Sequence, residues 1–368
     1  MTISYKYITS TLNADATLAV EIAEAVLPPP QGDEVVIAVE AAPINPSDLA
    51  LLFGPADLAA ATYEPGRILA PMPEAAMRAM QGRVGEAMAV GNEGAGTVIA
   101  AGSDPYAQSL IGRRVACAPG AMYATHALAK ANGCMPLPEA ISAEQGAGAF
   151  VNPLTALGFV ETMRRDGASA LVHTAAASNL GQMLVRLCAE EGVPLVNIVR
   201  SPAQVAILKA LGAQWVVDSS EPDFLDRLVE AIAATGAMLG YDAIGGGRMA
   251  ATILAAMEQV ASRSQPYSRY GSTTMKRVYV YGALDLSPTI LPRSFGFAWN
   301  LGGWLLTPWL AGLGAEGRMK LSMRVAAGLT TTFASAYKAS ISLDDILHRD
   351  IALACNAKAT GAKYLLVP

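Results

Sequence analysis

The chain has 368 residues, of which 52% are hydrophobic and 15% charged, and its formal net charge is −5. This length favours about two domains, and so apolar a composition excludes an intrinsically disordered chain. Because the acidic balance attracts neither phosphate backbones nor anionic lipid, we expect no nucleic-acid and no membrane partner.

The N-terminal part is predicted to consist mainly of strands and turns. Asp33–Glu40 alternates small apolar side chains on its two faces, and Gly96–Ala101 and Arg113–Ala118 are shorter runs of the same kind. The segment 55–90 is rich in Ala, Met and Pro and shows no such alternation. We expect it to be an inserted loop with one short helix at Glu74–Met80.

From about residue 152 the pattern changes to an alternation of strands and helices. The predicted strands are Ala170–Thr174, Leu195–Val199, Trp215–Val217, Met238–Asp242 and Val278–Tyr281. The predicted helices are Leu180–Glu191, Ala203–Leu211, Asp223–Ala234 and Arg248–Val260. Such alternation is typical of a doubly wound parallel sheet, so the fold class is α/β with a second, β-rich domain.

The pattern divides the chain into three parts. Residues 1–151 form the β-rich domain, 152–315 the doubly wound domain, and 316–368 a C-terminal segment that returns to the first domain through a strand at Lys363–Val367. The apolar run 295–314 resembles a membrane span in composition. It carries a proline and several glycines and has no flanking basic cluster, which favours a core or pocket-lining segment.

The stretch HTAAASNLGQM, residues 173–183, is the most informative about function. A strand ends there, small residues turn the chain, and a helix begins. Dinucleotide pyrophosphates bind at such a position, because small residues let the backbone approach and the helix N-terminus offers N–H donors. Ala176, Ser178 and Gly181 occupy the places of the usual three glycines, and Asn179 and Leu180 complete the turn. The alternative is an ordinary crossover made of small residues.

The end of the next strand discriminates between the two nicotinamide cofactors. A protein that binds NAD places Asp or Glu there, where the carboxylate bonds the ribose 2′-hydroxyl. This chain has Arg200 and Ser201 instead. A guanidinium pairs with a 2′-phosphate that a carboxylate would repel, so NADPH is the predicted cofactor. The alternative for Arg200 is a solvated surface arginine.

Several short segments now support a resemblance to a known superfamily. They are PINPSDL at 43–49, GNEGAGTV at 91–98, VNPLTALGF at 151–159, HTAAASNLGQ at 173–182 and GGWLLTPW at 302–309. In this order they resemble the medium-chain dehydrogenase/reductase superfamily, on the zinc-free side that holds NADPH:quinone oxidoreductases and 2-enoyl thioester reductases. The resemblance implies a GroES-like β-domain and a Rossmann domain for NADP.

The same resemblance assigns further site residues. It implies that Asn45 and Thr155 lie near the nicotinamide and that Asn152 holds the turn beside it. The pocket borders implied are Gly245, Gly246, Gly282, Ala283 and Leu284. For Asn45 and Asn152 the alternative is loop capping through Asx turns.

Zinc is not expected. The zinc enzymes of this superfamily carry a His where this chain has Asn92, and a Cys near the position of Asn45 and Pro46. A catalytic zinc needs about three protein ligands, whereas the three histidines and four cysteines of this chain are widely scattered. We expect the cysteines to be free thiols in a reducing cytoplasm, and no secretory signal is visible at the N-terminus.

Without a Lewis acid, the predicted reaction is hydride transfer from NADPH to an electrophile that needs no further activation. The 2-enoyl thioester reductases carry a Tyr proton donor shortly after the NPSD segment, and residues 49–58 contain none. Tyr63, in the expected loop, is the nearest substitute. A quinone takes its protons from water, so we favour a quinone or an enone as the substrate of a homodimeric reductase. The alternatives are an enoyl thioester reductase and a nucleotide-binding protein without turnover.

Overall fold

The computed structural model describes residues 2–361 and 363–368. Contacts divide the chain into two compact units, one of residues 1–151 and 322–368 and the other of residues 152–321. We expected the second boundary at 315/316. Helix α11, Gly314–Gly328, runs across both positions.

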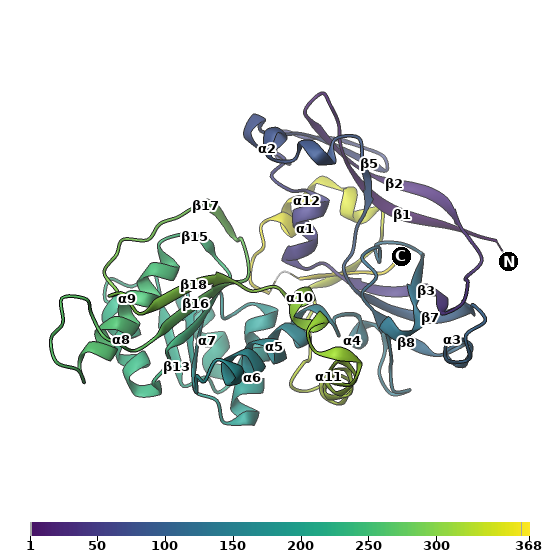
Figure 1. Cartoon of the computed structure of the whole chain (residues 1–368). Coiled ribbons are helices and arrows are strands. Elements are labelled where there is room, and N and C mark those ends of the chain that lie inside the picture. Colours follow the sequence, from purple (N-terminus) through teal and green to yellow (C-terminus); the bar gives the residue numbers. More distant parts are fainter. Residues whose placement is uncertain (1, 362) are drawn as a thin grey trace. The chain divides into compact units, whose positions relative to one another are not determined.

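The first unit contains two sheets (Figure 1). A five-stranded sheet has the order β4-β5-β2-β1-β6, and a seven-stranded sheet has the order β10-β8-β7-β3-β20-β19 with β9 also paired to β3. The strands are β1 Ile3–Leu12, β2 Thr17–Leu27, β3 Glu34–Pro43, β4 Thr62–Glu64, β5 Arg67–Pro71, β6 Ala87–Ala89, β7 Gly94–Ala101, β8 Arg114–Cys117, β9 His126–Lys130, β10 Cys134–Pro136, β19 Ala339–Ile341 and β20 Tyr364–Leu366. The helices are α1 Pro46–Leu52, α2 Glu74–Ala79, α3 Pro105–Ser109, α4 Ala143–Ala147 and α12 Arg349–Asn356.

The C-terminal strand β20 pairs antiparallel with β3, with Leu365 opposite Pro43. Its three residues are buried, and Tyr364 and Leu366 join a core that includes Ile37 and Ile341. Burial of these apolar side chains stabilises β20 against the core, and β3 offers its backbone a free edge to pair with. The end of the chain therefore completes the sheet begun near the start.

The expectation that 55–90 is a loop is wrong. β5 pairs with β2 along five positions, and it buries Ile68 and Ala70 while Leu69 between them is half-buried. Arg83 donates from one guanidinium nitrogen to backbone oxygens of Ser10 and Leu51, which ties the segment to β1 and α1. Only the helix at α2 was expected. The strand pattern was missed because it is five residues long and is set among Ala, Met and Pro.

The second unit is built on six parallel strands in the order β13-β12-β11-β14-β16-β18. Its strands are β11 Leu171–His173, β12 Leu195–Val199, β13 Trp215–Asp218, β14 Leu239–Asp242, β16 Lys276–Val280 and β18 Trp299–Gly303. A separate parallel pair is formed by β15 Gly245–Gly247 and β17 Asp285–Thr289. The helices are α5 Val151–Arg165, α6 Asn179–Glu191, α7 Pro202–Ala210, α8 Phe224–Thr235, α9 Met249–Ser262 and α10 Leu306–Ala311.

Helices cover both faces of this sheet. Consecutive strand residues point to opposite faces. In β14, a Cβ on Gly240 would lie 3.2 Å from Ile253 of α9, whereas Tyr241 stacks on Phe159 of α5 with ring centroids 3.8 Å apart. The strand order, numbered from the first strand, is 3-2-1-4-5-6, that of a dinucleotide-binding Rossmann sheet. The predicted α/β class with a doubly wound parallel sheet is confirmed.

The apolar run 295–314 supplies the sixth strand, β18, and the short helix α10. Within residues 2–361 and 363–368, no helix is both long enough and apolar enough to cross a bilayer.

Candidate functional site

The turn between β11 and α6 is shaped by the close approach of two backbone segments. A Cβ on Gly181 would lie 2.0 Å from the carbonyl oxygen of Ala176, so only glycine fits in the first turn of α6. Ala175 takes a positive φ of 50°, a conformation more usual for glycine. The turn therefore has the tight form of a glycine-rich loop although two of the expected glycines are absent.

The residues of this turn differ in what they can offer a ligand. Ser178 is the N-cap of α6, and its hydroxyl accepts a hydrogen bond from the Gly181 N–H at 3.1 Å. Ser178 and Asn179 are half-buried, whereas Ala176, Leu180 and Gly181 are buried. The buried residues can reach a ligand only through their backbone. The N–H groups at the start of α6 and its positive dipole end suit an anion.

A buried pair links the ends of β11 and β14. The Thr174 hydroxyl donates to Asp242 Oδ1 at 2.8 Å and accepts from the Ala243 N–H at 2.8 Å. The Asp242 carboxylate also accepts from the N–H groups of Ile244 and Gly245. This network fixes the path of the chain into the glycine triplet 245–247. Neither Thr174 nor Asp242 was singled out in the sequence, because their pairing depends on strands that are distant in the chain.

Two of the expected pocket residues meet backbone to backbone. A Cβ on Gly282 would lie 2.6 Å from the Ala243 oxygen, and one on Gly245 would lie 2.7 Å from the Gly282 oxygen. Gly246 is enclosed by Asp285 of β17 in the same way. These glycines are required for close packing between strand ends.

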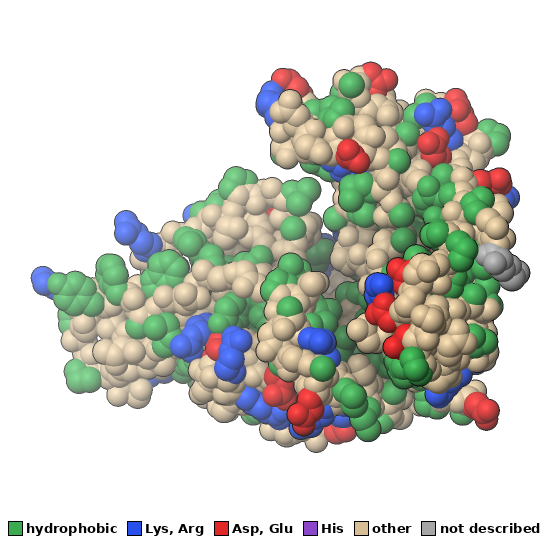
Figure 2. All heavy atoms as spheres, turned by 45° about the vertical axis from the view of Figure 1, so that its right-hand side comes forward, with side chains coloured by type: hydrophobic (Ala, Val, Ile, Leu, Met, Phe, Trp, Pro, Cys, Tyr) green, Lys and Arg blue, Asp and Glu red, His purple; other side chains and the backbone are tan. Residues whose placement is uncertain are grey.

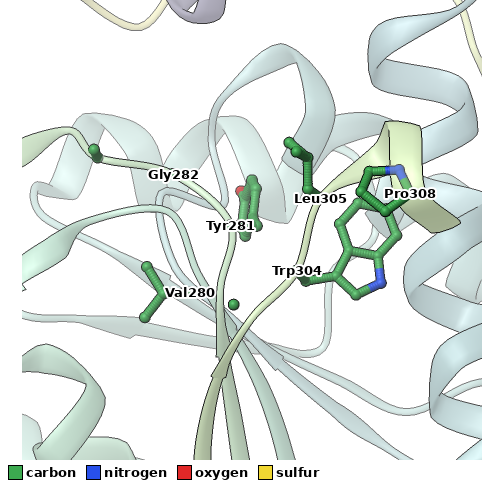
Figure 3. A pocket seen from close by; sticks show the side chains of 8 residues that line it. Val280, Tyr281, Gly282, Trp304, Leu305 and Pro308 are labelled. Atoms are coloured by element: carbon green, nitrogen blue, oxygen red, sulfur yellow. The ribbon is translucent and has the colours of Figure 1, made fainter.

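A hollow of about 540 Å³ lies beside the end of β16 (Figure 3). Its lining is mostly apolar and comprises Val280, Tyr281, Gly282, Ala283, Gly303, Trp304, Leu305 and Pro308. Of the predicted border residues, Gly282 and Ala283 line it. Leu284 is largely exposed outside it, and Gly245 lies directly behind Gly282. The aromatic lining residues Tyr281 and Trp304 were not predicted.

His173 and Tyr281 form a buried hydrogen-bonded pair behind this hollow. His173 Nε2 lies 2.7 Å from the Tyr281 hydroxyl oxygen, and the ring of Phe159 packs edge-on against Tyr281. Burial lowers the pKa of His173 to about 3 and raises the pKa of Tyr281. The imidazole is therefore neutral at physiological pH, and its other ring nitrogen has no hydrogen-bond partner among the described residues. A histidine so enclosed packs the core and is unsuited to act as a base.

Helix α5 carries the expected residues Asn152 and Thr155, which are both buried. Their spacing of three places them on one face of the helix. One turn further along, a Cβ on Gly158 would lie 2.6 Å from Trp304, and the indole N–H of Trp304 donates to the Thr162 hydroxyl at 3.1 Å. The polar face of α5 thus continues toward a side chain that lines the hollow.

Arg200 follows the last residue of β12. Its backbone N–H donates to Gln204 Oε1 at 3.0 Å, while its exposed guanidinium makes no hydrogen bond or ion pair within the described residues. Ser201 caps α7 by accepting from the Gln204 N–H at 3.4 Å. The backbone of Arg200 is fixed and its charged group is available.

In the first unit, Asn45 belongs to a buried polar cluster with Asp48 and Glu93. Asn45 Nδ2 donates to Glu93 Oε1 at 2.9 Å, and its backbone N–H donates to Asp48 Oδ2 at 2.8 Å. Glu93 Oε2 accepts from the N–H groups of Phe150 and Val151. Asn45 therefore precedes α1 as a capping residue and also contacts a carboxylate. Its place near a nicotinamide stays a prediction.

Burial raises the pKa of both carboxyls in this cluster, that of Asp48 to about 6. Lys363 lies near them, and burial lowers the pKa of its ammonium while the charges of Glu93 and Asp48 raise it. The Lys363 ammonium and the Tyr337 hydroxyl have no hydrogen-bond partner within the described residues, and both approach the position where a Cβ on Gly148 would lie. Lys363 and Tyr337 were missed because no short motif marks them.

Tyr63 is the weakest of the predicted site residues. It lies in β4, and its hydroxyl donates to the Leu58 carbonyl oxygen at 2.8 Å. Burial raises its pKa. Its side chain thus closes the turn before β4, which is the role of a structural tyrosine.

No three His, Cys, Asp or Glu side chains converge as a metal site within residues 2–361 and 363–368. Asn92, which the resemblance places where zinc enzymes carry a His, donates from Nδ2 to the Ser47 hydroxyl at 3.0 Å.

Residues 31–156 match the family described as alcohol dehydrogenase GroES-like domain. Among curated proteins, the mitochondrial enoyl-[acyl-carrier-protein] reductase of Arabidopsis thaliana is 28% identical over 301 residues, which cover 77% of this chain and 68% of that protein. A phenolphthiocerol/phthiocerol polyketide synthase component of Mycobacterium tuberculosis is 25% identical over 268 residues, 72% of this chain. The match spans only 11% of that synthase component.

Among solved structures, a protein named as an NADPH:quinone reductase from Mesorhizobium loti superposes with a TM-score of 0.76 and 27% identity, with 100% of both chains covered. The enoyl thioester reductase of Candida tropicalis, in a mutant form, has a TM-score of 0.68 at 19% identity, which is a likeness of fold. Residues 31–156 thus form a GroES-like domain of the alcohol dehydrogenase kind, and these similarities, with the Rossmann strand order, support the resemblance to the medium-chain dehydrogenase/reductase superfamily.

Proposed function

We propose that this chain is an NADPH-dependent reductase that transfers hydride to a quinone or to the activated double bond of an α,β-unsaturated carbonyl. The observation that carries the proposal is the available guanidinium of Arg200 at the end of β12, next to the tight turn before α6. When bound, NADPH supplies the hydride, and the protein supplies position and electrostatics.

The residues of the second unit fit such a cofactor. The N–H groups at the start of α6, with Ser178 and Asn179, would hold the pyrophosphate. Arg200 and Ser201 would hold the 2′-phosphate. Backbone at Gly245, Gly246, Gly282 and Ala283, together with Asn152 and Thr155, would border the nicotinamide end.

The acceptor is proposed from what surrounds the hollow. Tyr281, Trp304 and Leu305 give it an apolar wall, which suits a flat aromatic or enone acceptor. The Tyr63 hydroxyl is bonded to a backbone oxygen, so no tyrosine of the 49–63 region is poised to donate a proton. This favours an acceptor that takes its protons from water.

The second candidate, an enoyl thioester reductase, is favoured by the match to the Arabidopsis thaliana enzyme over 77% of this chain. The two are distinguished by following NADPH absorbance at 340 nm with p-benzoquinone, trans-2-hexenal and a crotonyl thioester in parallel. We expect the quinone or the enal to be reduced with the higher kcat/KM. A thioester reduced at least tenfold better would reverse the order of the candidates.

The same experiment tests whether the chain is an enzyme at all. A protein that binds the nucleotide without turnover would be stabilised by NADPH against thermal unfolding and would oxidise it with none of the acceptors. We further propose that the reaction needs no zinc, so that dialysis against a chelator leaves the rate unchanged. A lost rate restored by zinc would contradict this.

We also propose a cytoplasmic homodimer. Large apolar side chains are exposed on the second unit, among them Leu286 and Phe297, and Figure 2 shows hydrophobic side chains at its surface. A second copy of the chain would cover some of this apolar surface.

A further inference from the structure

Two of the four cysteines face each other across neighbouring strands of the first unit. Cys117 of β8 and Cys134 of β10 are direct partners in the antiparallel register. Directly opposed residues of an antiparallel pair have Cβ atoms about 4.5–5.5 Å apart, and their Cα separation falls within the range of a disulfide. Both residues are free thiols, and they lie close enough for one to hydrogen-bond the other. Closing a bond between them needs only a small approach of the two strands.

The pair also differs from the other cysteines in reactivity. The hydrogen bond from Cys117 lowers the pKa of Cys134, whereas burial raises the pKa values of Cys188 and Cys355 to about 12. The thiolate is the nucleophilic form of cysteine, so within the pair Cys134 is the sulfur that would attack first. Cys188 and Cys355 provide matched controls in the same chain.

A surface hollow reaches Cys117 and Gly133, the residue directly before Cys134. A hollow of about 330 Å³ lies against β8 and the turn before β10, and Cys117, Lys130 and Gly133 are among its lining residues. Lys130 also contributes its carbonyl oxygen, which lies 3.5 Å from the Cys134 sulfur. The pair is buried yet is adjacent to a surface hollow large enough for a hydroperoxide.

We propose that Cys117 and Cys134 form a peroxide-sensitive dithiol that closes into a cross-strand disulfide. The Cys134 thiolate attacks one oxygen of hydrogen peroxide, the O–O bond breaks, and hydroxide leaves and takes up a proton to become water. The Cys117 sulfur then attacks the resulting sulfenic acid, the S–O bond breaks and a second water forms. Two thiols are oxidised and one peroxide is reduced to two waters.

The bond would form next to the turn that holds Glu93. Cys117 is paired on its other side with Gly94 of β7, and its sulfur lies 3.8 Å from the Met122 sulfur. Met122 in turn donates its backbone N–H to Gly91 at the start of that turn. A disulfide would therefore join the outer strand β10 to the strand beside the buried polar cluster. Since it also closes a loop in the unfolded chain, the oxidised protein should melt at a higher temperature.

The test treats the full chain, folded and at pH 7.5, with a few equivalents of hydrogen peroxide. The protein is then denatured, its free thiols are alkylated, and its peptides are mapped by mass spectrometry. We expect a loss of two hydrogens, a linked peptide joining Cys117 to Cys134, and full alkylation of Cys188 and Cys355. Dithiothreitol should restore four reactive thiols and the lower melting temperature.

Variants keep the outcome interpretable. Cys188→Ser and Cys355→Ser should form the link as the unaltered chain does, and Cys134→Ser should not form it. Circular dichroism checks that each variant is folded. Alkylation of all four thiols after peroxide treatment, a link that appears only in urea, or oxidation of Cys134 to the sulfinic acid without a link would each overturn the proposal. So would a lower melting temperature on oxidation, because it would mean that the strands must be distorted to form the bond.

Discussion

Replacing Arg200 by Ala tests the cofactor assignment most directly. The guanidinium is exposed and makes no side-chain hydrogen bond or ion pair within the described residues, so its removal disturbs no polar contact of this kind. The backbone hydrogen bond to Gln204 remains in the variant, and α7 keeps its Ser201 cap. Any loss of affinity can therefore be assigned to the ligand and not to the fold.

The size of the effect follows from the chemistry of a phosphate contact. A hydrogen bond to a charged group is worth about 1.5–3 kcal/mol. Since Arg200 is exposed, we take about 1.5 kcal/mol for a single bond to the 2′-phosphate and about 3 kcal/mol for a bidentate one. Every 1.4 kcal/mol is about tenfold in Kd, so NADPH should bind about 10-fold to 150-fold more weakly to the variant. NADH has no 2′-phosphate, and its Kd should change by less than about twofold.

The assay is a fluorescence titration of both nucleotides at fixed ionic strength, because exposed charge pairs weaken with salt. Arg227→Ala is a matched control: Arg227 is also an exposed arginine of the same unit, on α8, and its loss should leave both affinities unchanged. Equal weakening of NADPH and NADH binding by Arg200→Ala would refute a 2′-phosphate role, and an unchanged NADPH affinity would leave Arg200 a solvated surface residue.

Four further outcomes are expected. Gly181→Ala places a Cβ 2.0 Å from a backbone oxygen and should abolish binding of both nucleotides in the titration. Gly82→Ala is the control, because a Cβ there has no other atom within 4 Å, and it should leave binding intact. Equal binding by both variants would mean that the turn is not the phosphate site. Thr174→Val leaves the buried Ala243 N–H without its partner and removes one of the hydrogen bonds of Asp242, and it should lower the free energy of unfolding by about 1–3 kcal/mol in urea titrations. An unchanged midpoint would show that the network is not needed. The pKa of Asp48 rises on folding from 3.8 to about 6, so the protonated group stabilises the fold below pH 3.8 and this contribution, about 3 kcal/mol, is lost as the pH rises through about 6. Asp48→Asn should remove this fall from a plot of the free energy of unfolding against pH. An identical pH profile for the variant would contradict the assignment. Leu286→Lys puts a charge at an exposed apolar position of β17 and should convert a dimer into a monomer in light scattering, and a dimer that persists would move the interface elsewhere.

The sequence alone predicts the Rossmann half of this protein because its signals are local. A buried parallel strand is a short run rich in β-branched residues, as in Leu195–Val199, and the helix that follows shows its own period and cap. Ser178, Gly181 and Arg200 are singled out in the same way, since their places are counted from a strand end. Even the replaced glycines are explained, because Gly181, the position that allows no Cβ, is the one that holds a glycine.

What the sequence could not predict depends on pairings between distant segments. The strands within 55–90 are short and set among weak strand formers, and they exist because β2 offers them a partner. The buried contact of Thr174 with Asp242, and that of Asn45 with Glu93, join residues dozens of positions apart. Tertiary structure decides such contacts, because a buried polar group must find its partner wherever the fold brings one. The cross-strand thiols are of the same kind: the chain shows two cysteines far from any motif, and only the register of β8 against β10 makes them a pair.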